Sequence, residues 1–222
     1  MGKSPSAEFD WRVYADATAA GLTALIPIPF VDMFLESTFR RRIPGAVAQA
    51  RGTWIDTSNR VALSRDRGGG LSLAGCLVLP LKVLRYILTK LWRKVIYIFA
   101  ITDATRQVSE YWNRAHLIDH MVRSGHLESD ADSDRAIESF DQVVGEIDPS
   151  PLMGLAREVV TASHRVFRTL IRARDEGTAA TMAALGAILG EHWDAAVRPL
   201  EDTAARYDEV YSAGRGAEVP RS

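Results

Sequence analysis

The chain has 222 residues, of which 47% are hydrophobic, 25% charged and 8% aromatic. This composition supplies a sizeable core, and it excludes a wholly disordered chain, a collagen-like fibre and a disulfide scaffold. The 27 basic and 28 acidic side chains give a formal net charge of -1. We therefore expect no nucleic-acid partner, because such proteins carry an excess of positive charge.

Apolar residues recur mostly at spacings of three and four, which predicts an all-α fold, a multi-helix bundle. The first helix is expected from Ala7 to Leu25. Ile26-Pro27-Ile28-Pro29 then ends it, because each proline lacks a backbone donor and disfavours helix at the preceding residue. A second helix is expected from Val31 to Ala50, with a kink at Pro44-Gly45 and an end at Gly52. Two helices joined by this Pro-rich segment predict a helical hairpin near the N-terminus.

Residues 61–126 form the most apolar part of the chain. Residues 53–70 are polar and predict a loop with a short helix at most. A long helical pattern follows from Leu71 to Ser124 and is disturbed at Pro80. We expect a break near Thr102-Asp103 and a stop at Gly125, because glycine commonly ends helices.

The C-terminal part also predicts helices. Residues Ser129 to Asp134 suggest an acidic connector, and a helix is expected from Asp134 to Glu146. Ser150-Pro151 is typical of a helix start and predicts a helix to Arg174. The last helix is expected from Thr178 to Ser212, with Pro199 as a kink or the start of a further helix.

These elements predict a single helical domain over residues 7–213, between a flexible start at residues 1–6 and a disordered tail at residues 214–222. The one cysteine, Cys76, cannot form an internal disulfide, which fits a reducing compartment. The longest run without a charged residue spans the 15 residues Ala17–Val31, which is too short for a transmembrane helix. We expect a cytoplasmic protein, at the inner face of the membrane if it binds lipid.

Charge is distributed unevenly. Residues 61–126 carry a net charge of +6 and residues 127–222 a net charge of -8. Within the basic part, Leu81–Phe99 predicts a helix with a wide apolar face that includes Trp92. Its other face is cationic and carries Lys82, Arg85, Lys90, Arg93 and Lys94. Such a helix is typical of binding to an anionic membrane surface. The alternatives are a core helix whose basic stripe faces solvent or the acidic half of the chain, and a helix that binds a partner protein.

A second apolar feature lies at the predicted hairpin. Its turn and the following helix present Ile26, Ile28, Phe30 and Phe34, before Arg40-Arg41-Arg42. Small residues on the first helix, including Ala20 and Gly21, allow a close approach between helices. We therefore interpret these apolar residues as a second membrane-binding element. The alternative is a soluble helical hairpin with a Pro-rich turn.

Residues Ala17 to Gly52 resemble the helical-hairpin segment of the EcsC-like and YcjF-type families. The resemblance is carried by Ile26-Pro27-Ile28-Pro29, Asp32 and Ala50-Arg51-Gly52. It implies an all-helical, membrane-associated bacterial protein, and the YcjF-type domain also follows a GTP-binding domain in some larger proteins. Phe30 departs from the family pattern, where glycine is common. The chain has no Gly-rich phosphate-binding motif, so a GTPase link would run through a partner.

Candidate catalytic chemistry is sparse. His116 and His120 are four residues apart, so a helix would place both on one face, as in some zinc sites. The sequence offers no third ligand, and the alternative is a polar helix face. We expect no cofactor and no catalytic residues. The favoured hypothesis is a non-enzymatic peripheral membrane protein. The second is a soluble helical scaffold or interaction module, which self-associates or binds a protein partner. The third is a metal-dependent enzyme.

Overall fold

The computed structural model describes residues 9–25, 31–65, 93–170, 183 and 186–217. The predicted all-α multi-helix bundle is confirmed, and the described ranges contain no strand. The helices are α1 (Trp11–Leu22), α2 (Val31–Ala50), α3 (Thr57–Leu63), α5 (Arg93–Arg123), α6 (Asp130–Glu146), α7 (Met153–Leu170) and α9 (Trp193–Ala217), with 3₁₀ turns η1 (Thr23–Leu25) and η3 (Ser150–Leu152). Residues 186–191 are also helical. The predicted turn at residues 26–30 lies outside the described residues, so the Pro-rich hairpin stays a prediction.

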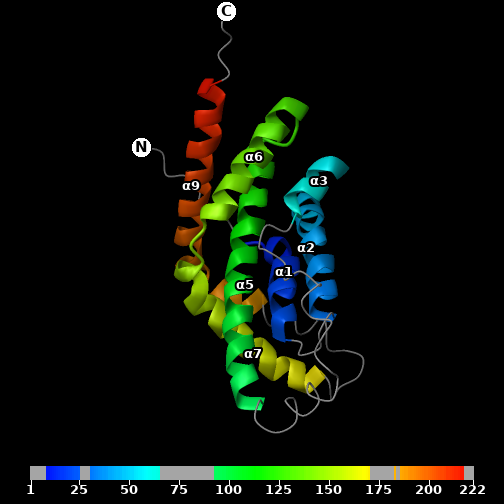
Figure 1. The fold of residues 1–222 in the computed structure, drawn as a ribbon, viewed down its shortest axis with the longest axis vertical. Helices are drawn as coiled ribbons and strands as arrows, with labels where there is room; N and C mark the ends of the chain where they lie inside the picture. Colours follow the sequence, from blue (N-terminus) through cyan, green and yellow to red (C-terminus); the bar gives the residue numbers. More distant parts are fainter. Residues whose placement is uncertain (1–8, 26–30, 66–92, 171–182, 184–185, 218–222) are drawn as a thin grey trace, which may run out of the picture.

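Helix α5 is the centre of the bundle (Figure 1). Helices α1, α2, α7 and α9 all pack against it, and α1 also packs along α2. Helix α6 lies against α9 and contacts α3. The core therefore follows the length of α5, and α2 and α3 form one side of the molecule.

The small residues of α1 face α5. Ala17 and Ala20 are buried, and a Cβ atom added at Gly21 would lie 2.5 Å from the backbone nitrogen of Val108. At this distance only glycine lets the two backbones approach. Beside this contact, the Trp112 indole N–H donates to the Thr18 hydroxyl at 2.8 Å, which satisfies a polar group inside the core. The predicted close approach of α1 to another helix is confirmed, and one partner is α5.

The predicted break at Thr102-Asp103 is wrong, because α5 continues through both residues. Their side chains are exposed and cost the helix little. The Asp103 carboxylate also accepts a hydrogen bond from the Gln107 side chain one turn later, at 3.1 Å. The predicted stop at Gly125 is confirmed, since α5 ends at Arg123 and Gly125 has a φ of 71°.

The predicted acidic connector is also wrong, because α6 begins at Asp130. The hydroxyl of Ser129 accepts a hydrogen bond from the backbone N–H of Asp132 and caps the helix. Asp130 and Asp132 then lie in the first turn, where the helix dipole stabilises negative charge. The acidic run is therefore the start of the helix and not the chain that precedes it.

The two internal prolines interrupt neither helix. Pro44 lies inside α2, which continues to Ala50 and is followed by Gly52 with a φ of 65°, as predicted for its end. Pro199 lies inside α9, so no new helix begins there. The last predicted helix is instead divided by a turn at His192, and α9 continues to Ala217, beyond the predicted domain end at residue 213.

Candidate functional site

Most of the predicted lipid-binding residues lie outside the described residues. These are Ile26, Ile28, Phe30, Lys82, Arg85, Lys90 and Trp92. Arg93 and Lys94 form the first two positions of α5, and the structure describes their backbone only. Phe34 is described, and its side chain is 70% exposed on α2. It is the one predicted lipid-binding side chain whose surroundings the structure gives.

Phe34 belongs to a larger group of exposed apolar side chains. Among the side chains that the structure describes, which leave out those of residues 31–33, 93–99 and 164–170, the large hydrophobic residues exposed to solvent are Phe34, Trp54 at 73% and Val61 at 57%. All three lie on α2, on α3 or on the connection between them. Isolated exposed hydrophobic residues are ordinary, but their restriction to one side of a bundle indicates a contact surface.

The exposed side of α2 is also basic. At 100° per residue, the positions of Phe34, Arg41, Arg42, Gly45 and Gln49 form one stripe, about 20 Å long. Residues 31–65 contain six arginines, no lysine and three acidic residues. We call the group Phe34, Arg41, Arg42, Trp54, Arg60 and Val61 the α2–α3 surface.

Two acidic side chains of this segment, those of Glu36 and Asp56, form local hydrogen bonds. Glu36 accepts hydrogen bonds from the Tyr111 hydroxyl and from Arg40. The Asp56 carboxylate caps α3, and hydrogen bonds from the Ser58 hydroxyl and then from the Ser58 backbone N–H, at 2.8 Å, lower the pKa of Asp56. The six arginines of residues 31–65 still outnumber the three acidic side chains, so this segment has a net positive charge.

A pocket of about 560 Å³ opens on this surface between α2 and α3. It is lined by Asp16, Arg42, Gly45, Ala46, Ala48, Gln49, Gly52, Thr53, Trp54, Ile55 and Arg60. The Arg60 guanidinium lies over the Trp54 ring, 5.8 Å from its centroid, and a Cβ atom added at Gly45 would lie 2.7 Å from Arg60 Nη2. Glycine at position 45 therefore makes room for this guanidinium.

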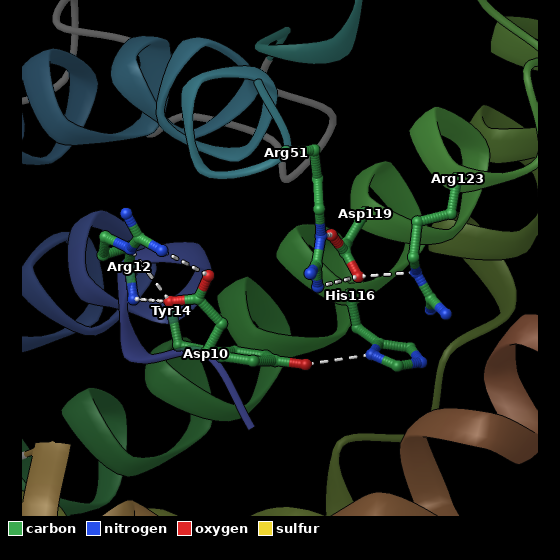
Figure 2. Close-up of polar contacts among 7 residues, drawn as sticks. All are labelled: Asp10, Arg12, Tyr14, Arg51, His116, Asp119 and Arg123. Carbon is green, nitrogen blue, oxygen red and sulfur yellow. Dashed lines mark hydrogen bonds and ion pairs between the residues drawn. The ribbon is translucent and has the colours of Figure 1, made fainter. Parts of the chain in front are cut away.

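A buried ionic cluster lies deeper in the bundle (Figure 2). The Asp119 carboxylate, only 3% exposed, accepts two hydrogen bonds from Arg51, at 2.6 Å from Nε and 3.0 Å from Nη2. Arg123, one turn further along α5, donates to the same carboxylate at 3.0 Å. Because Arg51 directly follows α2, the cluster joins the end of α2 to α5. Two cations around one buried anion indicate a structural role.

His116 lies beside this cluster and binds Tyr14. The Tyr14 hydroxyl and His116 Nδ1 are 2.9 Å apart, and both side chains are buried. Burial lowers the pKa of His116 to about 4 and raises that of Tyr14 far above its usual value. At neutral pH the imidazole is therefore uncharged, and Nδ1 and the Tyr14 hydroxyl form a hydrogen bond (Figure 2).

The two metal-site candidates bind different partners. His116 contacts Tyr14 on α1, whereas His120 Nε2 lies 2.7 Å from the Asp208 carboxylate on α9. Nδ1 of His116 is already occupied by a hydrogen bond. Within the described ranges, no group of three or more His, Cys, Asp or Glu side chains is arranged to hold a metal ion.

The sequence does not predict three members of the α2–α3 surface, namely Trp54, Arg60 and Val61. They lie in the segment predicted to be a polar loop with a short helix at most, and α3 is that short helix. The available signal is a tryptophan in an otherwise polar segment. Its exposure depends on where α3 packs, which local periodicity does not specify.

No helix in the described part of the chain combines the length and apolar character needed to cross a bilayer. Comparisons with protein-family models, with curated proteins and with solved structures find no match to this chain. The resemblance of residues 17–52 to the EcsC-like and YcjF-type families therefore stays a prediction.

Proposed function

We propose that this chain is a non-enzymatic, peripheral membrane-associated protein that binds an anionic lipid surface. The observation that carries the proposal is the composition of the α2–α3 surface. Every large apolar side chain that the structure shows as exposed lies there, among three arginines, where the side chains of residues 31–33, 93–99 and 164–170 are not described. A surface that combines aromatic rings with arginine fits the boundary between lipid headgroups and acyl chains.

The energies of such a contact are favourable. Each Lys or Arg close to an anionic leaflet contributes about 1 kcal/mol, so Arg41, Arg42 and Arg60 together contribute about 3 kcal/mol before ordering costs. Removing the exposed Phe34 and Trp54 rings from water adds a similar amount, at about 25 cal/mol for each Å² of apolar surface. The sum is enough for reversible surface binding and far below that of a transmembrane anchor.

The first residues of α5 supply a second element of the proposal. Helices α2 and α5 both begin toward the lower end of the bundle in Figure 1. Phe34 is the fourth residue of α2, and Arg93 and Lys94 are the first two residues of α5. The predicted amphipathic helix Leu81–Phe99 includes this pair. We propose that its cationic face contacts the same membrane as the α2–α3 surface, at the cytoplasmic face.

Co-sedimentation with vesicles tests the proposal. The full chain is mixed with phosphatidylcholine vesicles and with vesicles that also contain phosphatidylglycerol. We expect binding to the anionic vesicles that weakens as salt rises, because screening reduces the arginine contribution. A Phe34→Ser, Trp54→Ser double variant is expected to bind less, and so is a charge-reversed variant at Lys90, Arg93 and Lys94.

The matched control is Arg198→Gln, which removes an exposed arginine from α9, away from the α2–α3 surface. It is expected to bind as the unaltered chain does. Background binding to both kinds of vesicle would overturn the proposal. The alternative, a soluble scaffold in which the basic middle docks on the acidic half of another copy, predicts instead a sedimentation coefficient that falls as salt rises without lipid.

A further inference from the structure

The pocket between α2 and α3 carries an inference that rests on the proposed function and makes it more specific. Two of its lining side chains, Arg42 and Arg60, are guanidinium groups, and one, Asp16, is a carboxylate. The lining therefore has an excess of positive charge. Its volume of about 560 Å³ lies within the range of pockets that hold small organic ligands.

The two guanidinium groups differ in their partners. Arg42 forms an ion pair with Asp16, with 3.4 Å between Nη2 and Oδ1. Arg60 forms no ion pair with a carboxylate among the described residues, and its guanidinium group lies over the face of the Trp54 ring. Arg60 is therefore a cation in a concave site whose charge no described anion neutralises. Such a group favours an anionic ligand.

The backbone of α2 helps to place Arg60. Its Nη2 atom lies 2.7 Å from the position of a Gly45 Cβ atom, so the guanidinium rests against α2 where any other residue would put a side chain. Gly45 is three residues after Arg42, and side chains at this spacing are neighbours on a helix, about 5–6 Å apart at Cβ. Arg42 and Arg60 therefore flank the same part of the pocket.

Trp54 adds an apolar wall beside these cations. Its side chain is 73% exposed and lines the pocket with Ile55. An indole at this place offers a surface to the organic part of a ligand whose anionic group lies at the arginines.

We propose that this pocket binds a phosphate group carried on an organic molecule. The phosphate lies between Arg42 and Arg60, whose planar donors match its oxygens in a bidentate manner, and the organic part packs on Trp54. A lipid headgroup and a free phosphate ester share this chemistry. In the first case the pocket gives the membrane contact its headgroup preference.

Calorimetric titration of the full chain separates these sources. The probes are inorganic phosphate, dihexanoyl phosphatidic acid below its micelle concentration, and dihexanoylglycerol as the control without phosphate. We expect phosphatidic acid to bind more tightly than inorganic phosphate and dihexanoylglycerol not to bind. Arg60→Gln is expected to weaken phosphatidic acid binding about tenfold, the usual effect of losing one charged hydrogen-bond partner.

Gly45→Ala tests the arrangement without removing a charge. The added methyl group displaces the end of a flexible arginine side chain, so the helix is expected to keep its stability while the affinity for phosphatidic acid falls. Arg198→Gln is the matched control, because Arg198 is exposed on α9 and does not line the pocket. It is expected to change the affinity less than about twofold, as a surface charge does.

Two results would overturn the pocket proposal. One is an equal loss of affinity in Arg198→Gln and Arg60→Gln, and the other is a lack of binding of both phosphate-bearing probes. If neither probe binds while anionic vesicles still sediment the chain, the pocket proposal fails and the membrane proposal stands. If phosphatidic acid binds but no vesicle does, the pocket holds a free phosphate ester and the membrane proposal fails.

Discussion

The guanidinium group of Arg51 binds both carboxylate oxygens of Asp119, 68 residues further along the chain. Arg51 follows the last residue of α2, and Asp119 lies in the buried part of α5. The pair therefore holds the end of α2, and with it the start of the α3 connection, against the centre of the bundle. The α2–α3 surface depends on this attachment for its position.

Removal of Asp119 is expected to destabilise the fold strongly. Asp119→Ala leaves Arg51 and Arg123 without their shared anion, and breaking a buried pair from one side costs about 3 kcal/mol. Urea unfolding at pH 7 measures the loss. Arg123→Ala is the control, because its side chain is more exposed and the Arg51 contact remains; it is expected to cost less. Equal stability of Asp119→Ala and the unaltered chain would contradict the structural role.

Stability is expected to fall as the pH drops below neutrality, partly through His116. The unfolded imidazole takes up a proton near pH 6.5, whereas burial delays protonation in the folded chain to about pH 4. Between these values the unfolded state binds more protons, so the contribution of His116 is complete above pH 6.5 and is lost toward pH 4.

The variant His116→Asn isolates this effect. The amide keeps an acceptor for the Tyr14 hydroxyl but does not titrate. The difference in unfolding free energy between pH 7 and pH 5 is expected to be smaller in this variant than in the unaltered chain. A pH dependence that is the same in His116→Asn and in the unaltered chain would show that His116 is not the responsible group.

The close contact of α1 with α5 predicts an unequal response of glycines to alanine. Gly21→Ala places a methyl group 2.5 Å from the Val108 backbone nitrogen, and overpacking of this kind costs about 1–3 kcal/mol. Gly145 and Gly154 lie in α6 and α7 with open space around the added atom. Alanine at either position is expected to raise the melting temperature slightly, because alanine favours helix over glycine. A neutral Gly21→Ala would contradict the described packing.

The sequence predicts much of this fold because local chemistry determines it. Apolar spacing gives the all-α class, and Gly52 and Gly125 end their helices because they adopt positive φ angles. Local sequence rules fail where a residue type suits both a connector and the first turn of a helix. Asp130 and Asp132 read as a connector but belong to a helix whose cap, Ser129, directly precedes them.

The candidate site is less accessible to sequence reasoning. Phe34 is predicted from an apolar run, and it is exposed. The pairing of Arg51 with Asp119, and the contact of Arg60 with Trp54 and Gly45, join elements whose relative position depends on tertiary packing. No spacing rule of a single helix or strand reports such contacts. The four-residue spacing of His116 and His120 is correct for one face, yet their partners come from different helices.

Quenching of Trp54 by brominated lipid tests the membrane contact most directly. Bromine on the acyl chains quenches only indoles that reach the bilayer, so anionic vesicles of brominated lipid are expected to quench the fluorescence of the unaltered chain. Trp54→Phe keeps an apolar ring at this exposed position and is expected to reduce the quenched fraction. Two results would contradict the contact of the α2–α3 surface with lipid. One is that these vesicles do not quench the fluorescence of the unaltered chain, and the other is that they quench Trp54→Phe to the same extent.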